Sequence, residues 1–436
     1  MQYTLLIILI ILTFFSFISM GLDPFAPGFL MCASFTFSCL CMCYNAALWE
    51  INTDPLTVFV ISGGCLTFVI ANIICQFIYK KKILSVGKIN RMNKGVQDFK
   101  NNGFVSINRN LVLLVFVFDV LVLILYFIEV IKIAGFGSFT TMMYIFRQAT
   151  GFQGASVSFF VNILVRISKA FTTIFIFYCI RNVMAGKSIK SQLYLLFPVL
   201  PDLMCSLLTG GRFRLLQLIL GPIVIYGLLY FVKYGRKIKV KISLIAKVIV
   251  IAVFSLLLFY NVKSLVGRAE QTDIVTYVTE YFGGPIELFD VILRKGMGFH
   301  QPEIWGRNTF SSFYRYFVKF FDADIGMSAN PGWLTSRTGI NLGNVFTCFF
   351  IYYADFGLVG VFLLSFVAGC IWSVLYYKSL LSYKNVRKII YSFVFYGVLF
   401  QFYDEMTFTI FLSADMWMSF LFICFFEKHI KTRVKI

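Results

Sequence analysis

The sequence predicts an all-α polytopic membrane protein of about eleven transmembrane helices with one large hydrophilic loop. Two observations predict this fold class. Of the 436 residues, 59% are hydrophobic and only 14% are charged, values that soluble globular domains rarely approach. Apolar runs of about 20 residues, long enough to cross a hydrocarbon core as a helix, recur from end to end of the chain. Lipid is therefore expected to be its main solvent.

The predicted helices follow the apolar runs in order. The first run lacks the basic lead-in and cleavage site of a signal peptide, so a retained helix is expected. The predicted spans are 3–20, 27–49, 56–79, 111–131, 155–180, 192–209, 213–232, 242–260, 346–377, 388–404 and 409–427. They divide the chain into residues 1–260 with the first eight helices, the large loop 261–345, and residues 346–436 with the last three helices and a tail.

Charge predicts the orientation of these helices. The connection 80–110 contains eight lysines and arginines against one acid, Asp98, so the positive-inside rule makes it cytoplasmic. Threading outward from it also makes the basic connections 181–191, 233–241 and 378–388 and the C-terminal tail cytoplasmic. The formal charge of +19 therefore reports topology, and no nucleic-acid partner is expected.

The same threading gathers the less basic connections on the opposite, non-cytoplasmic face. They are Glu50 and Asp54, the stretch 132–154, the turn 209–212, the loop 261–341 and Tyr403–Glu405. The N-terminus would lie on this face too, unless the first pair of helices is misread. In the loop, apolar residues recur at three- and four-residue spacing from Val275 to Leu293, interrupted by Gly283-Gly284-Pro285, which predicts two short surface helices.

Cofactor and metal sites are not expected. The eleven cysteines lie in or beside apolar runs and none lies in the large loop, so disulfides and zinc sites are improbable. The sequence contains no phosphate-binding P-loop, no dinucleotide-binding glycine pattern, no clustered metal ligands and no paired aspartates of the kind that bind nucleotide sugars. Neither ATP nor a nucleotide-sugar donor is indicated.

Three charges fall inside predicted membrane helices. Arg166 and Lys169 lie near the middle of one helix, and Asp202 lies at a similar depth in the next. Charges at this depth cost about 2.5–3.5 kcal/mol each, so they usually face a partner or a polar cavity. The sequence leaves both readings open, a structural ion pair or the lining of a cavity, and Pro198 and Pro201 favour a kink there.

Arginines on the non-cytoplasmic side are the candidate ligands for an anionic substrate. Arg212 and Arg214 follow Gly210-Gly211 at a tight turn, where their guanidinium groups would match a phosphate or carboxylate. Either arginine alone could equally extend to lipid headgroups. The large loop adds Arg268, Arg294, Arg307, Arg315 and Arg337. For any single one of these, a salt bridge to a loop glutamate is the alternative.

The large loop also contains a candidate general base and candidate sugar-stacking aromatics. His300 titrates near neutrality, although a carboxyl group could take the same role. The carboxyl candidates are Glu280, Glu287, Asp290, Glu303, Asp355, Asp404 and Glu405. Tyr281 and five other loop aromatics could stack on sugar faces or form an interfacial belt.

Three short segments resemble the O-antigen polymerases (Wzy), which polymerise oligosaccharide repeat units of bacterial surface polysaccharides. They are Leu208-Thr-Gly-Gly-Arg-Phe-Arg214, Tyr281-Phe-Gly-Gly-Pro-Ile-Glu-Leu-Phe289 and the stretch 344–360 at the start of a membrane helix. The topology is similar along the whole chain, whereas the sequence likeness is confined to these segments.

The resemblance implies a multi-pass protein of the bacterial inner membrane with a periplasmic large loop. Its substrates would be oligosaccharides linked through diphosphate to undecaprenol, with a chain-length regulator and a flippase of the same pathway as partners. Arg212 and Arg214 would hold the donor diphosphate, and His300 or a carboxylate would deprotonate the acceptor hydroxyl. A lipid-linked O-antigen ligase and a flippase or transporter are the alternatives.

Overall fold

The computed structural model describes residues 1–91, 104–209, 213–235, 256–257, 260–261, 273–296, 305–314 and 331–432. Seven of the described helices are long and apolar enough to cross a membrane. They are α1 (Gln2–Ser19), α2 (Pro27–Tyr44), α3 (Pro55–Arg91), α5 (Arg109–Ala134), α7 (Phe159–Met184), α10 (Phe213–Tyr234) and α14 (Cys348–Leu381). The predicted all-α membrane class is therefore confirmed.

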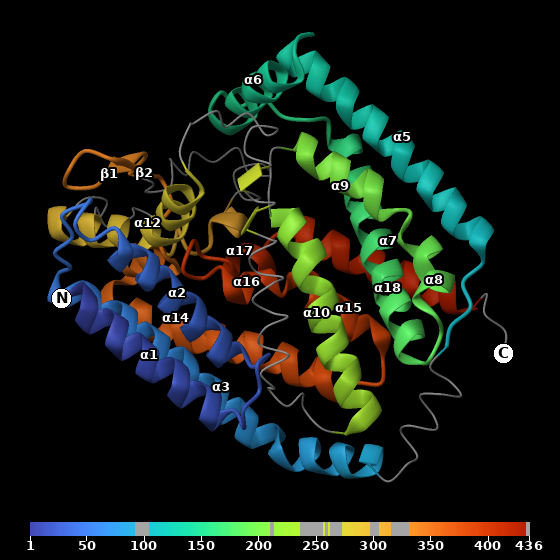
Figure 1. Cartoon of the computed structure of the whole chain (residues 1–436), viewed down its shortest axis with the longest axis horizontal. Coiled ribbons are helices and arrows are strands. Elements are labelled where there is room, and N and C mark those ends of the chain that lie inside the picture. The colour runs from blue at the N-terminus through green and yellow to red at the C-terminus, as the bar shows by residue number, and fades with distance from the viewer. Residues whose placement is uncertain are drawn as a thin grey trace.

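Shorter elements connect and cap these spans. They are α6 (Phe139–Phe152), α8 (Ile189–Gln192), the 3-10 helix η1 (Leu193–Leu196), α9 (Val199–Leu208), α12 (Ile274–Lys295), α15 (Asn385–Val394), α16 (Tyr396–Leu399), α17 (Thr407–Phe411) and α18 (Ala414–Thr432). Strands β1 (Leu334–Thr335) and β2 (Asn341–Gly343) form a small antiparallel hairpin. Figure 1 shows the N-terminal and C-terminal ends on opposite sides of the helical bundle.

The helix count of about eleven is not established. The predicted span 192–209 is divided into η1 and α9 with a bend of 41°, and Pro198 at the break has no N–H to continue a helix. The predicted span 388–404 is divided into α15 and α16, and α16 ends at Leu399. Beyond it, the backbone oxygen of Gln401 accepts from the Cys348 N–H at the start of α14. The predicted span 242–260 lies almost entirely outside the described residues.

Small residues bring the central helices together. A Cβ atom added to Gly369 of α14 would lie 2.7 Å from the backbone oxygen of Phe68 in α3, so the two backbones touch. This is the packing that membrane helices use, because lipid gives no hydrophobic drive to hold helices together. A second, separate core joins α5, α6, α7 and α9.

The large loop contains one continuous helix where two short ones were predicted. Asp273 caps the start of α12 by accepting from the Val275 and Thr276 N–H groups, and Gly296 ends it in a left-handed conformation. The prediction of a break at Gly283-Gly284-Pro285 was wrong. A proline inside a helix removes one hydrogen bond, and here tertiary contacts outweigh that loss.

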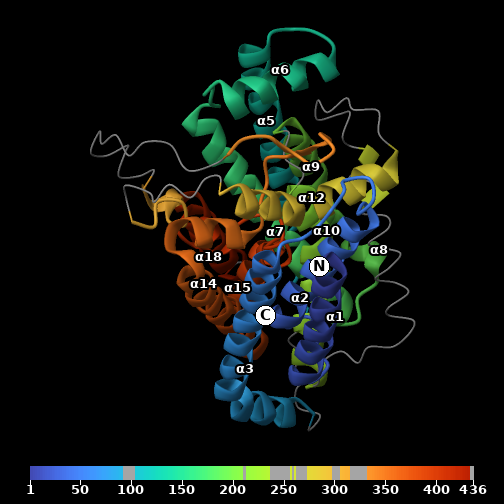
Figure 2. The ribbon, with the colours of Figure 1, turned by 90° about the vertical axis from the view of Figure 1, so that its left-hand side faces the viewer.

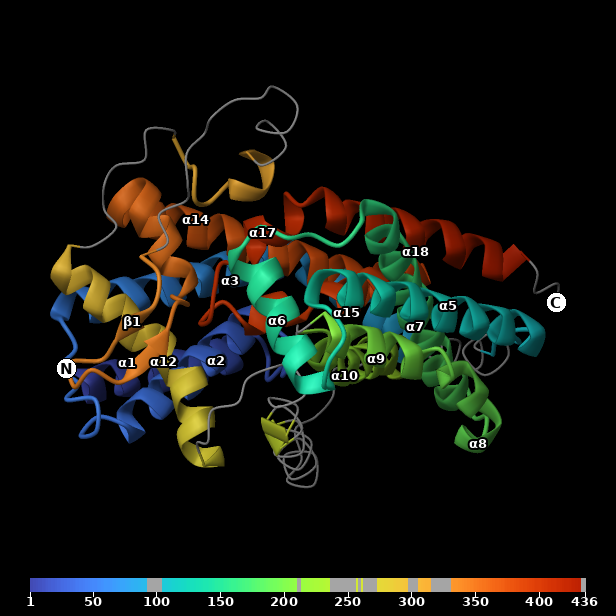
Figure 3. The ribbon, with the colours of Figure 1, turned by 90° about the horizontal axis from the view of Figure 1, so that it is seen from above.

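Helix α12 lies across the ends of α2 and α3 (Figures 2 and 3). A Cβ atom on Gly283 would be only 2.6 Å from the backbone nitrogen of Met42, so glycine permits this approach. Ser38 of α2 donates to the backbone oxygen of Phe282 at 2.6 Å, and Asp290 accepts from the Asp54 N–H and the Thr57 hydroxyl.

Segments far apart in the sequence meet at this end of the bundle, which we call the α12 end. The hairpin reaches the loop between α2 and α3, because Arg337 donates to the Asn52 oxygen and Thr338 to the Leu48 oxygen. Tyr281 of α12 stacks on Tyr403, with ring centroids 4.9 Å apart. The structure thus brings together, at one end, connections that charge threading predicted to share a face.

We expect Gly283→Ala to displace α12. The added methyl group would overlap the α2 backbone, and overpacking typically costs about 1–3 kcal/mol. Thermal unfolding of the purified protein in detergent should show a lower midpoint. Gly151→Ala in α6 is the control, because nothing lies within 4 Å of that position. Equal midpoints for both variants would contradict the close packing of α12 against the α2 backbone at Gly283.

Candidate functional site

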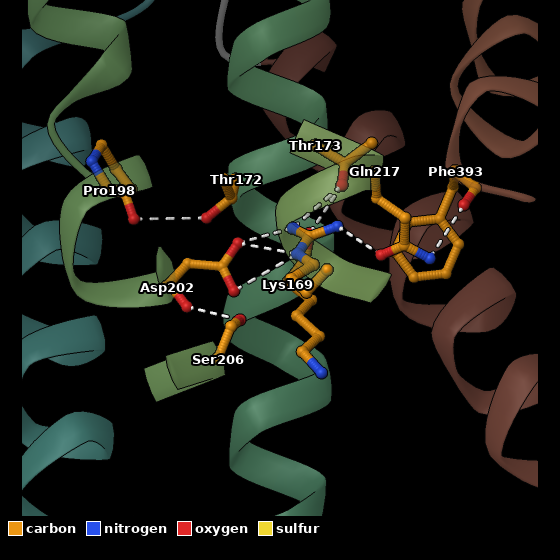
Figure 4. Close-up of polar contacts among 9 residues, drawn as sticks. Lys169, Thr172, Thr173, Pro198, Asp202, Ser206, Gln217 and Phe393 are labelled. Atoms are coloured by element: carbon orange, nitrogen blue, oxygen red, sulfur yellow. Dashed lines mark hydrogen bonds and ion pairs between the residues drawn. The ribbon is translucent and has the colours of Figure 1, made fainter. Parts of the chain in front are cut away.

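A buried ion pair lies at the centre of the charges predicted inside the membrane (Figure 4). Nη2 of Arg214, at the start of α10, lies 2.5 Å from Oδ2 of Asp202 in α9. The side chains are only 6% and 1% exposed, and Nε of Arg214 also donates to Asp202. The pair joins α9 and α10, the helices before and after residues 209–212.

Every nitrogen of the Arg214 guanidinium has an acceptor. Nη1 donates to Gln217, whose amide donates in turn to the Phe393 oxygen. Nη2 also donates to the Lys169 backbone oxygen. A small pocket between α7, α10 and α15 lies beside this network. Arg214 is therefore engaged in packing the bundle, and its predicted role as a diphosphate ligand has no support here.

The predicted partners of Asp202 pair differently. Arg166 of α7 lies 2.8 Å from Oδ2 of Asp415 in the first turn of α18. The Lys169 side chain forms no ion pair or hydrogen bond within the described part of the chain. The reason is that Arg214, one helix further on, is closer to Asp202 than either α7 cation. The predicted intramembrane polar cluster of Arg166, Lys169 and Asp202 thus also includes Arg214.

Sequence reasoning missed one further buried charge. Asp119 of α5 is only 1% exposed, and neither carboxyl oxygen has a hydrogen-bond partner among the described residues. Ser168 lies beside it, without hydrogen-bond geometry. The available signal was an acid in the middle of the predicted span 111–131, which an average over hydropathy conceals.

At the α12 end, three carboxyl groups have different surroundings. Glu405 accepts from the Tyr352 hydroxyl and from three N–H groups at the start of α17. Asp355 accepts from the backbone and side chain of Asn308 and from the Thr309 N–H. Both carboxylates are occupied as structural caps. They fix α17 and the segment 305–314 against α14.

Asp404 is the carboxyl group that remains available. Its Oδ1 accepts from the Glu405 N–H at 2.7 Å, and the side chain makes no other hydrogen bond among the described residues. The side chain is half-buried, and the preceding residue in the chain is Tyr403, whose ring stacks on Tyr281. Burial raises the pKa of Asp404 to about 7, with the nearby Glu405 charge adding to the rise. A carboxyl group with this pKa can exchange a proton near neutral pH.

Two carboxyl groups of α12 lie near one arginine of the same helix. Arg294 faces both Glu287, at 3.5 Å, and Asp290, at 2.7 Å. Glu287 is fully buried, and its Oε2 has no hydrogen-bond partner among the described residues. Burial raises the pKa of Glu287 to about 8, and Asp290 adds to the rise, whereas Arg294 and Arg337 oppose it. Arg294 thus forms the loop salt bridge that the sequence offered as its alternative role.

The remaining predicted site residues divide into two groups. Arg212, Arg268, His300 and Arg315 lie outside the described residues. Arg307 is half-buried in the segment 305–314, and its Nη2 has no acceptor among the described residues. This segment packs on α17 through Phe310 and Phe408, whose ring centroids lie 5.7 Å apart.

Comparison with known proteins adds no functional information. No family model, no curated protein and no solved structure matches the chain. The geometry and the sequence resemblance therefore carry the functional argument.

We expect Arg214→Ala and Asp202→Ala each to destabilise the protein strongly. Removing one partner leaves a buried charge unpaired, which typically costs about 3–5 kcal/mol. The double variant Asp202→Leu with Arg214→Met should recover most of the loss, since it leaves no charge behind. Thermal midpoints in detergent measure this. A double variant no more stable than the singles would refute an ion pair with a purely structural role.

We expect Glu287 to make stability depend on pH. Its folded-state pKa of about 8 exceeds the usual value, so the unfolded chain loses this proton first as the pH rises. The contribution is complete below about pH 4.5 and is lost progressively up to about pH 8. Between these limits, the thermal midpoint of Glu287→Gln should fall less steeply with pH than that of the native protein. Equal slopes of thermal midpoint against pH for the two proteins would count against a raised pKa of Glu287.

Proposed function

We propose that the protein is a glycosyltransferase that joins undecaprenyl-diphosphate-linked oligosaccharide repeat units into a surface polysaccharide. The reaction would occur at the α12 end, on the periplasmic face of a bacterial inner membrane. The resemblance of the three short segments to the O-antigen polymerases supports this proposal. So does the position of two of them, since Tyr281–Phe289 lies in α12 and the stretch 344–360 begins α14, at the same end of the bundle.

The observation that carries the proposal is the setting of Asp404. It directly follows Tyr403, whose ring stacks on Tyr281, and aromatic faces of this kind bind sugars by stacking. Burial raises its pKa to about 7, which suits a general base. Glu405 and Asp355, fully occupied by hydrogen bonds, hold the surrounding elements in place.

The proposed reaction is displacement at the anomeric carbon of the donor sugar. Asp404 would accept the proton of the acceptor hydroxyl as that oxygen bonds to the anomeric carbon. The bond to the lipid diphosphate breaks, and the diphosphate leaves with the electron pair. Arginine guanidinium groups would stabilise the charge that develops on it. Arg212 remains proposed for this role, and Arg307 is a second candidate because its Nη2 lacks an acceptor among the described residues.

A ligase that transfers a finished glycan to lipid A core would use similar chemistry, and the products separate the two activities. Purified protein supplied with lipid-diphosphate repeat units alone, without nucleotide or metal, should form a ladder of polymer lengths. Transfer that occurs only when lipid A core is added would replace the polymerase proposal with the ligase. Absence of glycosyl transfer under both conditions would refute both.

We expect Asp404→Asn to slow ladder formation by about 10²–10⁴-fold, the usual contribution of a general base. The asparagine oxygen can still accept from the Glu405 N–H, so the fold should persist. In the native protein the rate should rise with pH through about 7, because the base must be ionised. Asp273→Asn is the control, since asparagine caps helices as well as aspartate. A full rate with Asp404→Asn would exclude this residue as the base.

A further inference from the structure

Lys169 is a cation in a membrane helix, and its side chain has no partner among the described residues. It lies in α7, roughly 15 Å along the helix axis from Phe159. Its charged neighbours are Arg214, Asp202 and Arg166, and Arg214 already binds Asp202. Asp119, the other buried carboxyl of this region, is not among those neighbours. Charges inside a membrane normally have a partner or face a polar path, so the missing partner needs an explanation.

The direction of the Lys169 side chain indicates where a partner for its charge would lie. Figure 4 shows it extending away from Thr172 and Thr173, and therefore toward the N-terminal end of α7. Helical side chains lean this way, and long lysine chains extend toward the membrane surface. Arg166 lies one turn nearer that end. Two cations three residues apart on one helix repel each other unless an anion lies between them.

The α18 contact indicates that this site lies near the lipid headgroups. Arg166 is 18% exposed, whereas its partner Asp415 is 59% exposed. In the same first turn of α18, Trp417 is 55% exposed, and exposed tryptophans concentrate at the membrane–water interface. The second terminal nitrogen of Arg166, Nη1, is buried and has no hydrogen-bond partner among the described residues. One guanidinium nitrogen therefore remains available for an anion.

We propose that Arg166 and Lys169 bind the diphosphate headgroup of the lipid-linked substrate as it enters between α7 and α18. This inference rests on the proposed function and names the residues of that site which receive the lipid carrier. Lysine supplies a compact positive charge and arginine supplies directed donors, a combination suited to phosphate oxygens. A lipid is the expected source because the exposed Asp415 and Trp417 on α18 indicate interface depth, where the polyprenyl chain can stay in the hydrocarbon.

Native mass spectrometry of the detergent-purified full chain tests this proposal. The probes are undecaprenyl diphosphate, phosphatidylglycerol and inorganic pyrophosphate, each titrated separately. Lys169→Met should weaken undecaprenyl diphosphate binding by about tenfold or more, since a charge-assisted contact is lost. Lys169→Arg should retain binding. Lys132→Met is the matched control, because Lys132 is exposed and pairs with Glu129.

Thermal stability separates binding from a structural role. An unpaired cation contributes nothing to the empty protein, so Lys169→Met should unfold at the same or a higher temperature. A lower midpoint together with unchanged binding would overturn the proposal. If Lys169→Met does not purify as a monodisperse protein, Lys169→Gln provides the same comparison.

Each probe result has a defined meaning. Equal binding of undecaprenyl diphosphate by the native and Lys169→Met proteins would overturn the site. Binding of pyrophosphate alone, or equally tight binding of phosphatidylglycerol, would overturn its assignment to the lipid diphosphate. The assay contains no glycan and no acceptor. Lysine-dependent binding without glycosyl transfer in either the polymerase or the ligase assay would therefore uphold this site while refuting glycosyl transfer.

Discussion

The packing of α12 on the ends of α2 and α3 is the contact on which the α12 end depends. It requires that Gly283 have no side chain, because the α2 backbone occupies the place of a Cβ atom. Asp290 then fixes the opposite part of the helix to the start of α3. The helix of the large loop thereby becomes part of the bundle. Tyr281 is carried with it into contact with Tyr403.

Among the charges in the membrane, those with a structural role differ from those available to a ligand in whether they are paired, and not in how deep they lie. Arg214 has an acceptor for every guanidinium nitrogen and joins α7, α9, α10 and α15. Lys169 lies beside it and has no partner for its side chain within the described part of the chain. Burying a charge costs far less when hydrogen bonds replace its water. The paired charge can thus stabilise the bundle, while the unpaired one is better explained by a ligand.

The carboxyl groups at the α12 end follow the same principle. Glu405 accepts four hydrogen bonds and Asp355 accepts three, so their oxygens are committed to positioning α17 and the segment 305–314. Asp404, adjacent in the chain to Glu405, accepts one hydrogen bond from the part of the chain that the structure describes. Two neighbouring acids of similar chemistry therefore have different hydrogen-bonding surroundings.

The sequence by itself determined the membrane class and the positions of the long apolar helices, because lipid requires runs of about 20 apolar residues whatever their neighbours are. It also predicted that Tyr403–Glu405 and the large loop share a face, since charge bias acts through local composition. Only the tertiary structure decided the pairing of Asp202 with Arg214, the continuity of α12 through Gly283-Gly284-Pro285, and the availability of Asp404. These depend on which helices touch, and distances between segments far apart in the chain leave no local pattern in composition or periodicity.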